Sequence, residues 1–312
     1  MKYYVVVDGG GTKTDFMIST PEKKELFGVR TGSTSIKSVG FEIAQNNMHA
    51  GFEKIKSRLD FHKEDVLFCI FGISGCDSKE DELQIKNIIE NIDWNVKKEY
   101  YLCNDAVLAF YAKVERPGMI LISGTGSIVI GIDEKGMITR TGGWGYGISD
   151  QGSGQWLGME AIRHTLLYCD GCIPYEDWFD KVRKTVGAEN FEDVPGIVTS
   201  YDSYDQIAAL AKILLDEAEG KLRNRILDEG AKALALLLNS NYKKMHIQNK
   251  EKLKIGFAGG CLRNNEYANA VKNYLIEQIK EAVMQDGDEI PICTPVEGGR
   301  KLIEIMYGPE SR

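Results

Sequence analysis

Two short glycine-rich turns are the segments of this 312-residue chain best suited to bind phosphate. Residues 8–12 (Asp-Gly-Gly-Gly-Thr) follow an apolar run, and residues 123–127 (Ser-Gly-Thr-Gly-Ser) follow another. Because glycine has no Cβ, the backbone N–H groups of such a turn can converge on phosphate oxygens. Plain β-hairpin turns use the same residues. Since two such turns each open a similar stretch of chain, we favour phosphate binding.

Two familiar phosphate-binding loops are excluded by spacing and context. A P-loop needs G-x-x-x-x-G-K-[ST] at the start of a helix, and the glycines at 9–11 do not have that spacing. A dinucleotide loop needs a third glycine at position 14, where this chain has Thr14. The next residues, 15–18, are typical of a strand and not of a helix. Both turns are therefore expected to connect strand to strand.

Two aspartates stand where a carboxylate could take part in group transfer. Asp8 ends the first predicted strand, where it could bind Mg²⁺ through water or merely satisfy the amides of the turn. Asp105 follows one predicted strand and precedes a helical stretch, which is where ligand crevices form in α/β proteins. It could accept a hydroxyl proton, or it could serve only as the N-cap of the helix. The residues alone leave both alternatives open.

Strands and helices alternate along the chain, which predicts an α/β fold. Apolar runs predict strands over residues 2–7, 12–19, 25–30, 66–73, 100–103, 119–122, 128–133, 252–257 and 289–293. Helical spacing predicts helices over residues 41–59, 81–92, 106–113, 157–167, 205–215, 227–238, 265–281 and 298–306. A glycine-dense loop spans 142–158. The plan of strand, glycine turn and strand occurs twice, which indicates two related lobes.

Composition narrows the class of partner. The formal net charge of −8 argues against a nucleic-acid surface, and no apolar run approaches the roughly 20 residues that span a bilayer. The first residues lack the pattern of a signal peptide, and seven cysteines suit a reducing compartment, so we expect a cytoplasmic protein. Cys169 and Cys172 form one CxxC without a second pair, which favours ordinary thiols over a metal or redox site.

Six motifs occur in order along the chain. They lie at residues 6–15, 104–106, 123–127, 142–145, 150–153 and 258–260. Together they resemble the N-acetylglucosamine kinase branch of the BadF/BadG/BcrA/BcrD ATPases, within the actin/hexokinase/Hsp70 superfamily. Each motif alone is weak, whereas the ordered set is specific and runs from residue 2 to the C-terminal helix.

The resemblance implies an ATP-dependent kinase built from two ribonuclease H-like (actin-like ATPase) lobes with a nucleotide cleft between them. We expect one lobe over residues 1–115, joined by the C-terminal helix 297–312, and the other over 116–296. Asp105 would be the catalytic base, and Asp8 would hold Mg²⁺ through a water molecule. Nucleotide contacts would come from Gly10, Gly11, Thr12, Lys13, Gly126, Ser127, Gly259 and Gly260. Sugar contacts would come from Ser35, Asn104, Asp105, Thr125, Gly143, Trp144 and Asp150.

Two departures from the family pattern leave the acceptor open. Ser35 aligns with an Asn of the family, and Gln151 replaces a Glu in the segment 150–153. An unpaired buried polar group costs about 1–3 kcal/mol, enough to change which amino sugar is preferred. The 6-hydroxyl of N-acetylglucosamine is the expected acceptor, with glucosamine or another hexosamine as alternatives. An ATPase without sugar kinase activity, an activator of a radical dehydratase and a non-catalytic sugar sensor are further alternatives. Homodimers are common in the family.

Overall fold

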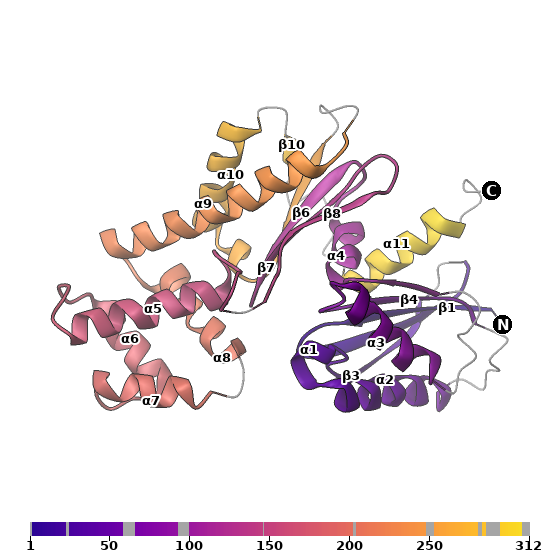
Figure 1. Cartoon of the computed structure of the whole chain (residues 1–312), viewed down its shortest axis with the longest axis horizontal. Helices are drawn as coiled ribbons and strands as arrows, with labels where there is room; N and C mark the ends of the chain where they lie inside the picture. The colour runs from indigo at the N-terminus through magenta and orange to yellow at the C-terminus, as the bar shows by residue number, and fades with distance from the viewer. Residues whose placement is uncertain are drawn as a thin grey trace. The chain divides into compact units, whose positions relative to one another are not determined.

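The computed structural model describes residues 2–22, 25–58, 66–92, 100–145, 147–201, 204–247, 253–279, 283–284 and 294–307. The chain divides into two compact units (Figure 1). The first unit comprises Met1–Lys113 with Ile290–Arg312, and the second comprises Val114–Glu289. Each unit contains one five-stranded sheet with helices packed on it.

The first unit has the strand order β3-β2-β1-β4-β5. Its strands are β1 (Tyr3–Gly9), β2 (Lys13–Ser19), β3 (Glu25–Gly32), β4 (Val66–Ile73) and β5 (Tyr100–Cys103). The first three pair antiparallel, whereas β4 pairs parallel to β1 and β5 pairs parallel to β4. A central strand such as β4 is buried on both faces, which explains its continuous apolar sequence.

Helices cover both faces of this first sheet. They are α1 (Ile36–Val39), α2 (Phe41–Lys56), α3 (Lys79–Glu90), α4 (Asp105–Lys113) and α11 (Pro295–Tyr307). Figure 1 shows α2 and α3 on one face and α4 and α11 on the other. Side chains of β1 alternate accordingly: Val5 and Val7 join the core under α2, whereas Val6 approaches Gly299 of α11. Phe16 and Phe52 meet edge-to-face in that core, with their ring centroids 5.7 Å apart.

The second sheet repeats the topology of the first. Its strands are β6 (Gly118–Ser123), β7 (Ser127–Ile132), β8 (Ile138–Gly142), β9 (Lys254–Ala258) and β10 (Val283–Met284), in the order β10-β9-β6-β7-β8. Again three strands form an antiparallel meander, and two more join in parallel on the other side of the opening strand. The predicted repetition of strand, turn and strand is thus a repeated sheet, and the predicted α/β class is confirmed.

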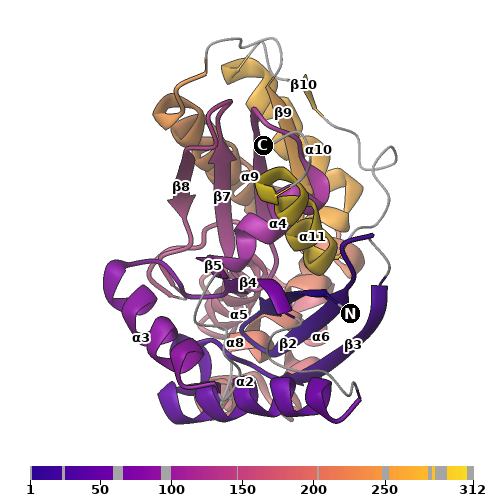
Figure 2. The same cartoon turned by 90° about the vertical axis from the view of Figure 1, so that its right-hand side faces the viewer.

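The second unit is richer in helices than the first. They are α5 (Gly154–Cys169), α6 (Asp177–Val186), α7 (Val194–Thr199), α8 (Tyr204–Ala209), α9 (Lys221–Lys244) and α10 (Asn265–Gln278), with 3₁₀ turns η2 (Phe191–Asp193) and η5 (Cys261–Arg263) and a π-helical turn η3 (Ile213–Glu217). The long helix α9 packs along β6, β7 and β8, and α10 packs against α9 (Figure 2). None of the helices in the described ranges is both long and apolar enough to cross a membrane.

Several predicted elements differ from the structure in their bounds. The helix predicted to begin at 157 begins at Gly154, because the hydroxyl of Ser153 accepts a hydrogen bond from the N–H of Trp156 at 3.2 Å and caps it. The predicted helix 205–215 is wrong, since α8 ends at Ala209 and the π-helical turn follows. Buried apolar residues continue across that break, so their spacing resembles one helix. The predicted strand 289–293 lies outside the described residues, and β10 was not predicted.

Candidate active site

Pairing register brings chemically useful residues to one edge of the first sheet. Asp8 of β1 lies beside Gly72 of β4, and Gly72 lies beside Cys103 of β5. Because these strands are parallel, their carboxyl ends meet at the same edge. Asp105, the first residue of α4, follows two residues after Cys103. A Cβ on Gly72 would lie 2.4 Å from a side-chain atom of Leu108, so glycine lets the first turns of α4 approach the sheet.

Asp8 is a half-buried carboxyl with an altered affinity for protons. Burial raises its pKa to about 7, and the negative charges of Asp105 and Asp15 add to the shift. The charge of Lys13 opposes it. The positive charge near this carboxyl is therefore too small to offset the negative charges around it. A hard divalent cation bound there would supply the missing positive charge.

Asp105 has a similarly raised pKa. Burial raises it to about 7, a hydrogen bond from the N–H of Ala106 lowers it, and the charge of Asp77 raises it again. The N–H of Ala106 lies 3.0 Å from Asp105 Oδ1 and 2.9 Å from Asn104 Oδ1. Asn104 precedes the helix and shares the capping of α4, so capping does not depend on Asp105 alone. A carboxyl with a pKa near neutrality can both take up and release a proton.

The first glycine turn is a tight hairpin held by the segment after β3. The N–H of Gly10 donates to the carbonyl of Lys13 at 2.9 Å, and the hydroxyl of Ser33 donates to the carbonyl of Gly10 at 2.8 Å. Thr12 and Lys13 are exposed, and Gly11 is partly exposed. Ser35, predicted to contact the sugar, is only 1% exposed, and its hydroxyl accepts from that of Ser38 at 3.2 Å.

The second glycine turn is bonded to the start of α5. The N–H of Gly154 donates to the carbonyl of Gly124 at 2.7 Å, and that of Gln155 donates to the carbonyl of Thr125 at 3.0 Å. Across the turn, the N–H of Gly124 donates to the carbonyl of Gly126 at 2.9 Å. The bonds from Gly154 and Gln155 satisfy amides of the first turn of α5 that have no partner within the helix. The hydroxyl of Thr125 donates to Asp205 at 2.8 Å.

Asp150 fixes the end of this second turn. It is buried, it has a positive φ of 71°, and its Oδ1 accepts from the N–H of Ser127 at 3.1 Å. The hydroxyl of Ser127 in turn donates to the carbonyl of Gln151 at 3.1 Å. The side chain of Gln151 is exposed. The predicted sugar ligand Asp150 is therefore brought together with the predicted nucleotide ligand Ser127.

The late glycine pair lies against the same turn. Gly259 has a φ of 96°, and a Cβ there would lie 2.2 Å from the carbonyl oxygen of Ser123. Gly260 has open space around the position of a Cβ. The thiol of Cys261 points to the carbonyl of Gly124 at 3.6 Å. The structure thus brings the two segments predicted to bind nucleotide in this unit into contact.

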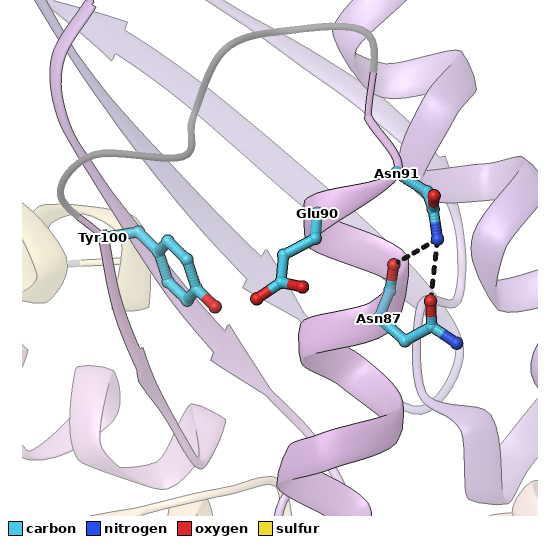
Figure 3. A pocket seen from close by; sticks show the side chains of 4 residues that line it. All are labelled: Asn87, Glu90, Asn91 and Tyr100. Carbon is cyan, nitrogen blue, oxygen red and sulfur yellow. Dashed lines mark hydrogen bonds between the residues drawn. The ribbon is translucent and has the colours of Figure 1, made fainter.

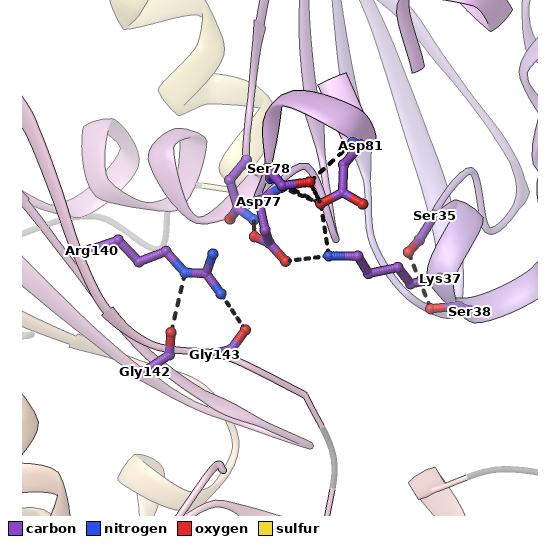
Figure 4. A network of polar contacts seen from close by, with 10 residues as sticks. Ser35, Lys37, Ser38, Asp77, Ser78, Asp81, Arg140, Gly142 and Gly143 are labelled. Atoms are coloured by element: carbon purple, nitrogen blue, oxygen red, sulfur yellow. Dashed lines mark hydrogen bonds and ion pairs between the residues drawn. The ribbon is translucent and has the colours of Figure 1, made fainter. Parts of the chain in front are cut away.

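An arginine that sequence reasoning did not single out holds the loop after β8. Arg140 Nε donates to the carbonyl of Gly142 at 3.1 Å, and its Nη2 donates to that of Gly143 (Figure 4). The guanidinium also lies 4.6 Å from the ring centroid of Trp144, which is 69% exposed. A planar fork that matches two carbonyls is specific to arginine. Arg140 belongs to none of the sequence motifs, so the sequence did not indicate this contact.

The predicted site residues fall on both units. Asp8, Gly10, Gly11, Thr12, Lys13, Ser35, Asn104 and Asp105 belong to the first unit, and Thr125, Gly126, Ser127, Gly143, Trp144, Asp150, Gly259 and Gly260 belong to the second. Within the described ranges, no group of three or more acidic, histidine or cysteine side chains could hold a metal ion. A Mg²⁺ ion at Asp8 would thus take most of its ligands from water and phosphate, as Mg²⁺ commonly does. Cys169 and Cys172 are free thiols at the end of α5.

A separate hollow lies at the end of α3. It has a volume of about 500 Å³ and is lined by Asn87, Glu90, Asn91 and Tyr100 (Figure 3). The side-chain amide of Asn91 donates to both the carbonyl and the side chain of Asn87. No predicted site residue lines this hollow, so it adds nothing to the site above.

Comparisons with known proteins support a single family. A model of the BadF/BadG/BcrA/BcrD ATPase family matches residues 5–299. The chain is 33% identical to the N-acetylmuramic acid/N-acetylglucosamine kinase of Clostridium acetobutylicum over 275 residues, covering 86% of this chain and 88% of that protein. It is 29% identical to the N-acetyl-D-glucosamine kinase of Dictyostelium discoideum over 293 residues, covering 89% and 90%. A solved structure of a candidate N-acetylglucosamine kinase from Chromobacterium violaceum has a TM-score of 0.73 at 20% identity, covering 97% of this chain and 99% of that one, which establishes the likeness of fold.

Substitution of the two late glycines should show that only one of them is required by the packing of the protein itself. Gly259→Ala is expected to lower the free energy of unfolding by about 2–4 kcal/mol, because its Cβ would clash with the carbonyl of Ser123 at a positive φ. Gly260→Ala is the matched control and should leave stability nearly unchanged, since its Cβ meets open space. Urea unfolding of both variants measures the difference. Equal stability of the two would contradict the described packing.

The raised pKa of Asp8 predicts a pH-dependent gain in stability on removal of its charge. The folded-state pKa lies above that of the unfolded chain, so ionisation destabilises the wild type increasingly from about pH 4 to about pH 7. Asp8→Asn should raise the free energy of unfolding by about 1–2 kcal/mol at about pH 8 without Mg²⁺, and the gain should vanish near pH 4. Urea unfolding across this range is the measurement. A gain of the same size at every pH would argue against a raised pKa.

Proposed function

The chain belongs to the BadF/BadG/BcrA/BcrD ATPase family, and on that premise we propose that it is an ATP-dependent kinase that phosphorylates an amino sugar. We take N-acetylglucosamine as the acceptor and its 6-hydroxyl as the position. Membership in an ATPase family implies ATP, and relatives matched over most of their length are amino-sugar kinases. Glucosamine is an alternative acceptor, because a glucosamine kinase of Vibrio cholerae is 28% identical over 187 residues.

The observation that carries the proposal is Asp105. It is a half-buried carboxyl with a pKa near 7 at the start of α4, at the edge where the parallel strands end. Transfer of a phosphoryl group to an alcohol needs a carboxylate that accepts the hydroxyl proton, and a base works best with a pKa near the operating pH. Asp105 would take the proton of the sugar hydroxyl at one of its carboxylate oxygens as that hydroxyl attacks the γ-phosphorus. The bond from that phosphorus to the β,γ-bridging oxygen breaks, and ADP leaves.

The glycine turns are assigned to the nucleotide. Backbone N–H groups of Gly11 and Gly126 would donate to phosphate oxygens, the exposed Thr12 would lie beside them, and the exposed ammonium of Lys13 would add positive charge. Gly10 and Ser127 use their own N–H groups within the protein, so they would shape the turns. Gly260, where no side chain fills the space, would let the adenosine approach closely, and Gly259 would shape its turn.

The sugar contacts are assigned first to residues that are at least partly exposed. The ring of Trp144 can lie against the apolar face of a pyranose, and Gly143, Thr125 and Asn104 add polar groups. Ser35 and Asp150 are buried and already hydrogen-bonded, which favours a supporting role for both. Asp8 is the candidate carboxylate that would hold Mg²⁺, and the ion would supply positive charge that offsets the charge of the phosphates.

A panel of acceptors with MgATP tests the proposal. We expect turnover with N-acetylglucosamine, tested beside glucosamine, N-acetylmuramic acid and N-acetylmannosamine in a coupled ADP assay. A 6-deoxy analogue of the best acceptor should bind without being phosphorylated, because it lacks the reacting hydroxyl. Absence of turnover with every member would overturn the kinase assignment, and turnover of the 6-deoxy analogue would overturn the position.

Asp105→Asn should lower kcat by about 10²–10⁴-fold, since the amide cannot accept the hydroxyl proton. Sugar affinity, measured by calorimetry, should change only a few-fold because the amide is nearly isosteric. Asp177→Asn is the matched control, since Asp177 is also the first residue of a helix, α6, in the second unit. Full activity of the Asp105 variant would exclude it as the base.

A further inference from the structure

We propose that Asp77 is a positioning residue for phosphoryl transfer. It would hold Asn104, and through Asn104 the first turn of α4 that carries Asp105, while Lys37 fixes Asp77 in turn. The inference rests on the proposed function, because it concerns the same base. Nothing in the motifs of the family resemblance includes Asp77 or Lys37.

The side chain of Asn104 is held from two directions. Its Oδ1 accepts from the N–H of Ala106 at 2.9 Å, and its Nδ2 donates to Asp77 Oδ1 at 2.9 Å. A side-chain amide can be rotated so that its oxygen and nitrogen exchange places. Here the neighbour on one side is a donor and the neighbour on the other is an acceptor, so only one orientation satisfies both. Asp77 therefore sets the orientation in which Asn104 caps the helix that begins with Asp105.

The two carboxylate oxygens of Asp77 contact different side chains. Its Oδ1 accepts from Asn104, and its Oδ2 lies 3.0 Å from Lys37 Nζ (Figure 4). Lys37 Nζ also lies 2.9 Å from Asp81 Oδ2. Hydrogen bonds to ionised groups are stronger than neutral ones, and the side chain of Asp77 is only 14% exposed. The contact between Asp77 and Asn104 is thus a charged, sheltered bond and not a surface ion pair.

Asp77 is itself held by the start of α3. Its N–H donates to Asp81 Oδ2 at 3.2 Å, and Asp81 forms a capping box with Ser78. Lys37 belongs to α1, which begins directly after the segment 33–35 that holds the first glycine turn. Three segments distant in the sequence, at 37, 77 and 104, therefore converge beside the base. A displacement of about 1 Å at a reacting group can cost about 100-fold in rate, so this bracing has a functional consequence.

Two substitutions of Asp77 separate its two contacts. Asp77→Leu removes both and should lower kcat by about 10- to 100-fold, with the KM for ATP changed less than threefold. Asp77→Asn keeps an oxygen that can accept from Asn104 and loses only the charge beside Lys37, so it should recover most of kcat. Steady-state kinetics with the best acceptor of the wild type measure both. This recovery is a readout that loss of stability alone would not produce.

Asp81→Asn is the matched control. Asp81 is the other carboxylate partner of Lys37, and its substitution weakens the cap of α3 without touching Asn104. The amide oxygen of the new side chain can still accept from the N–H of Asp77, so Asp77 stays held. We expect a lower unfolding temperature and a kcat within about twofold of the wild type. Equal losses of kcat in Asp81→Asn and Asp77→Leu would overturn the inference, and so would unchanged kcat in Asp77→Leu.

The outcomes distinguish this inference from the proposed function. If the wild type phosphorylates no acceptor, the kinase assignment fails and the inference fails with it. If the wild type is active, the kinetics of the Asp77 variants test this inference separately from the kinase assignment. Should Asp77→Leu fail to fold, Asp77→Ser decides, because its shorter hydroxyl cannot span to both partners and the same loss of kcat is expected.

Discussion

Parallel pairing beside an antiparallel hairpin is the constraint on which the rest of the structure depends. In the first sheet β1 must bond β2 on one side in a hairpin and β4 on the other side in parallel. The hairpin places a glycine turn at the end of β1, and the parallel pairing places the ends of β4 and β5 at the same edge. A turn able to bind phosphate and a helix N-terminus bearing a carboxyl are thereby brought together by backbone bonds alone.

The second sheet has the same strand pairing, but the residues at its edge differ in their chemistry. Its hairpin turn after β6 is bonded to the start of α5, and its parallel strand β9 ends in the Gly259 turn that contacts Ser123. Carboxylates also have different surroundings in the two units. Asp8 carries a raised pKa in the first, whereas Asp150 in the second accepts from a backbone N–H and fixes a turn. A single topology therefore gives one unit carboxyls with a raised pKa and the other a shaped loop.

Much of the fold could be predicted because its signals are local. The strands β4 and β5 match their predicted bounds, since a buried parallel strand is a continuous apolar run with clear ends. The π-helical break after α8 could not be predicted, because burial continues through it. The glycine turns and Asp105 were found from motifs, and their roles stay predictions. Lys37 and Asp77 were missed because their partners lie tens of residues away in the sequence and become neighbours only in the folded unit. Arg140 was missed although its carbonyl partners are two and three residues further on, because no motif marks that contact.

The loop after β8 contains a tryptophan whose fluorescence reports on its surroundings. Trp144 is 69% exposed with a guanidinium 4.6 Å from its ring, whereas Trp178 is 2% exposed in the core. An indole in water emits at a longer wavelength than a buried one, and a neighbouring cation alters its excited state. Any molecule that covers Trp144 would therefore change its part of the emission spectrum, over a background from the other three tryptophans of the chain. Binding at this loop can thus be followed by the intrinsic fluorescence of the unlabelled protein.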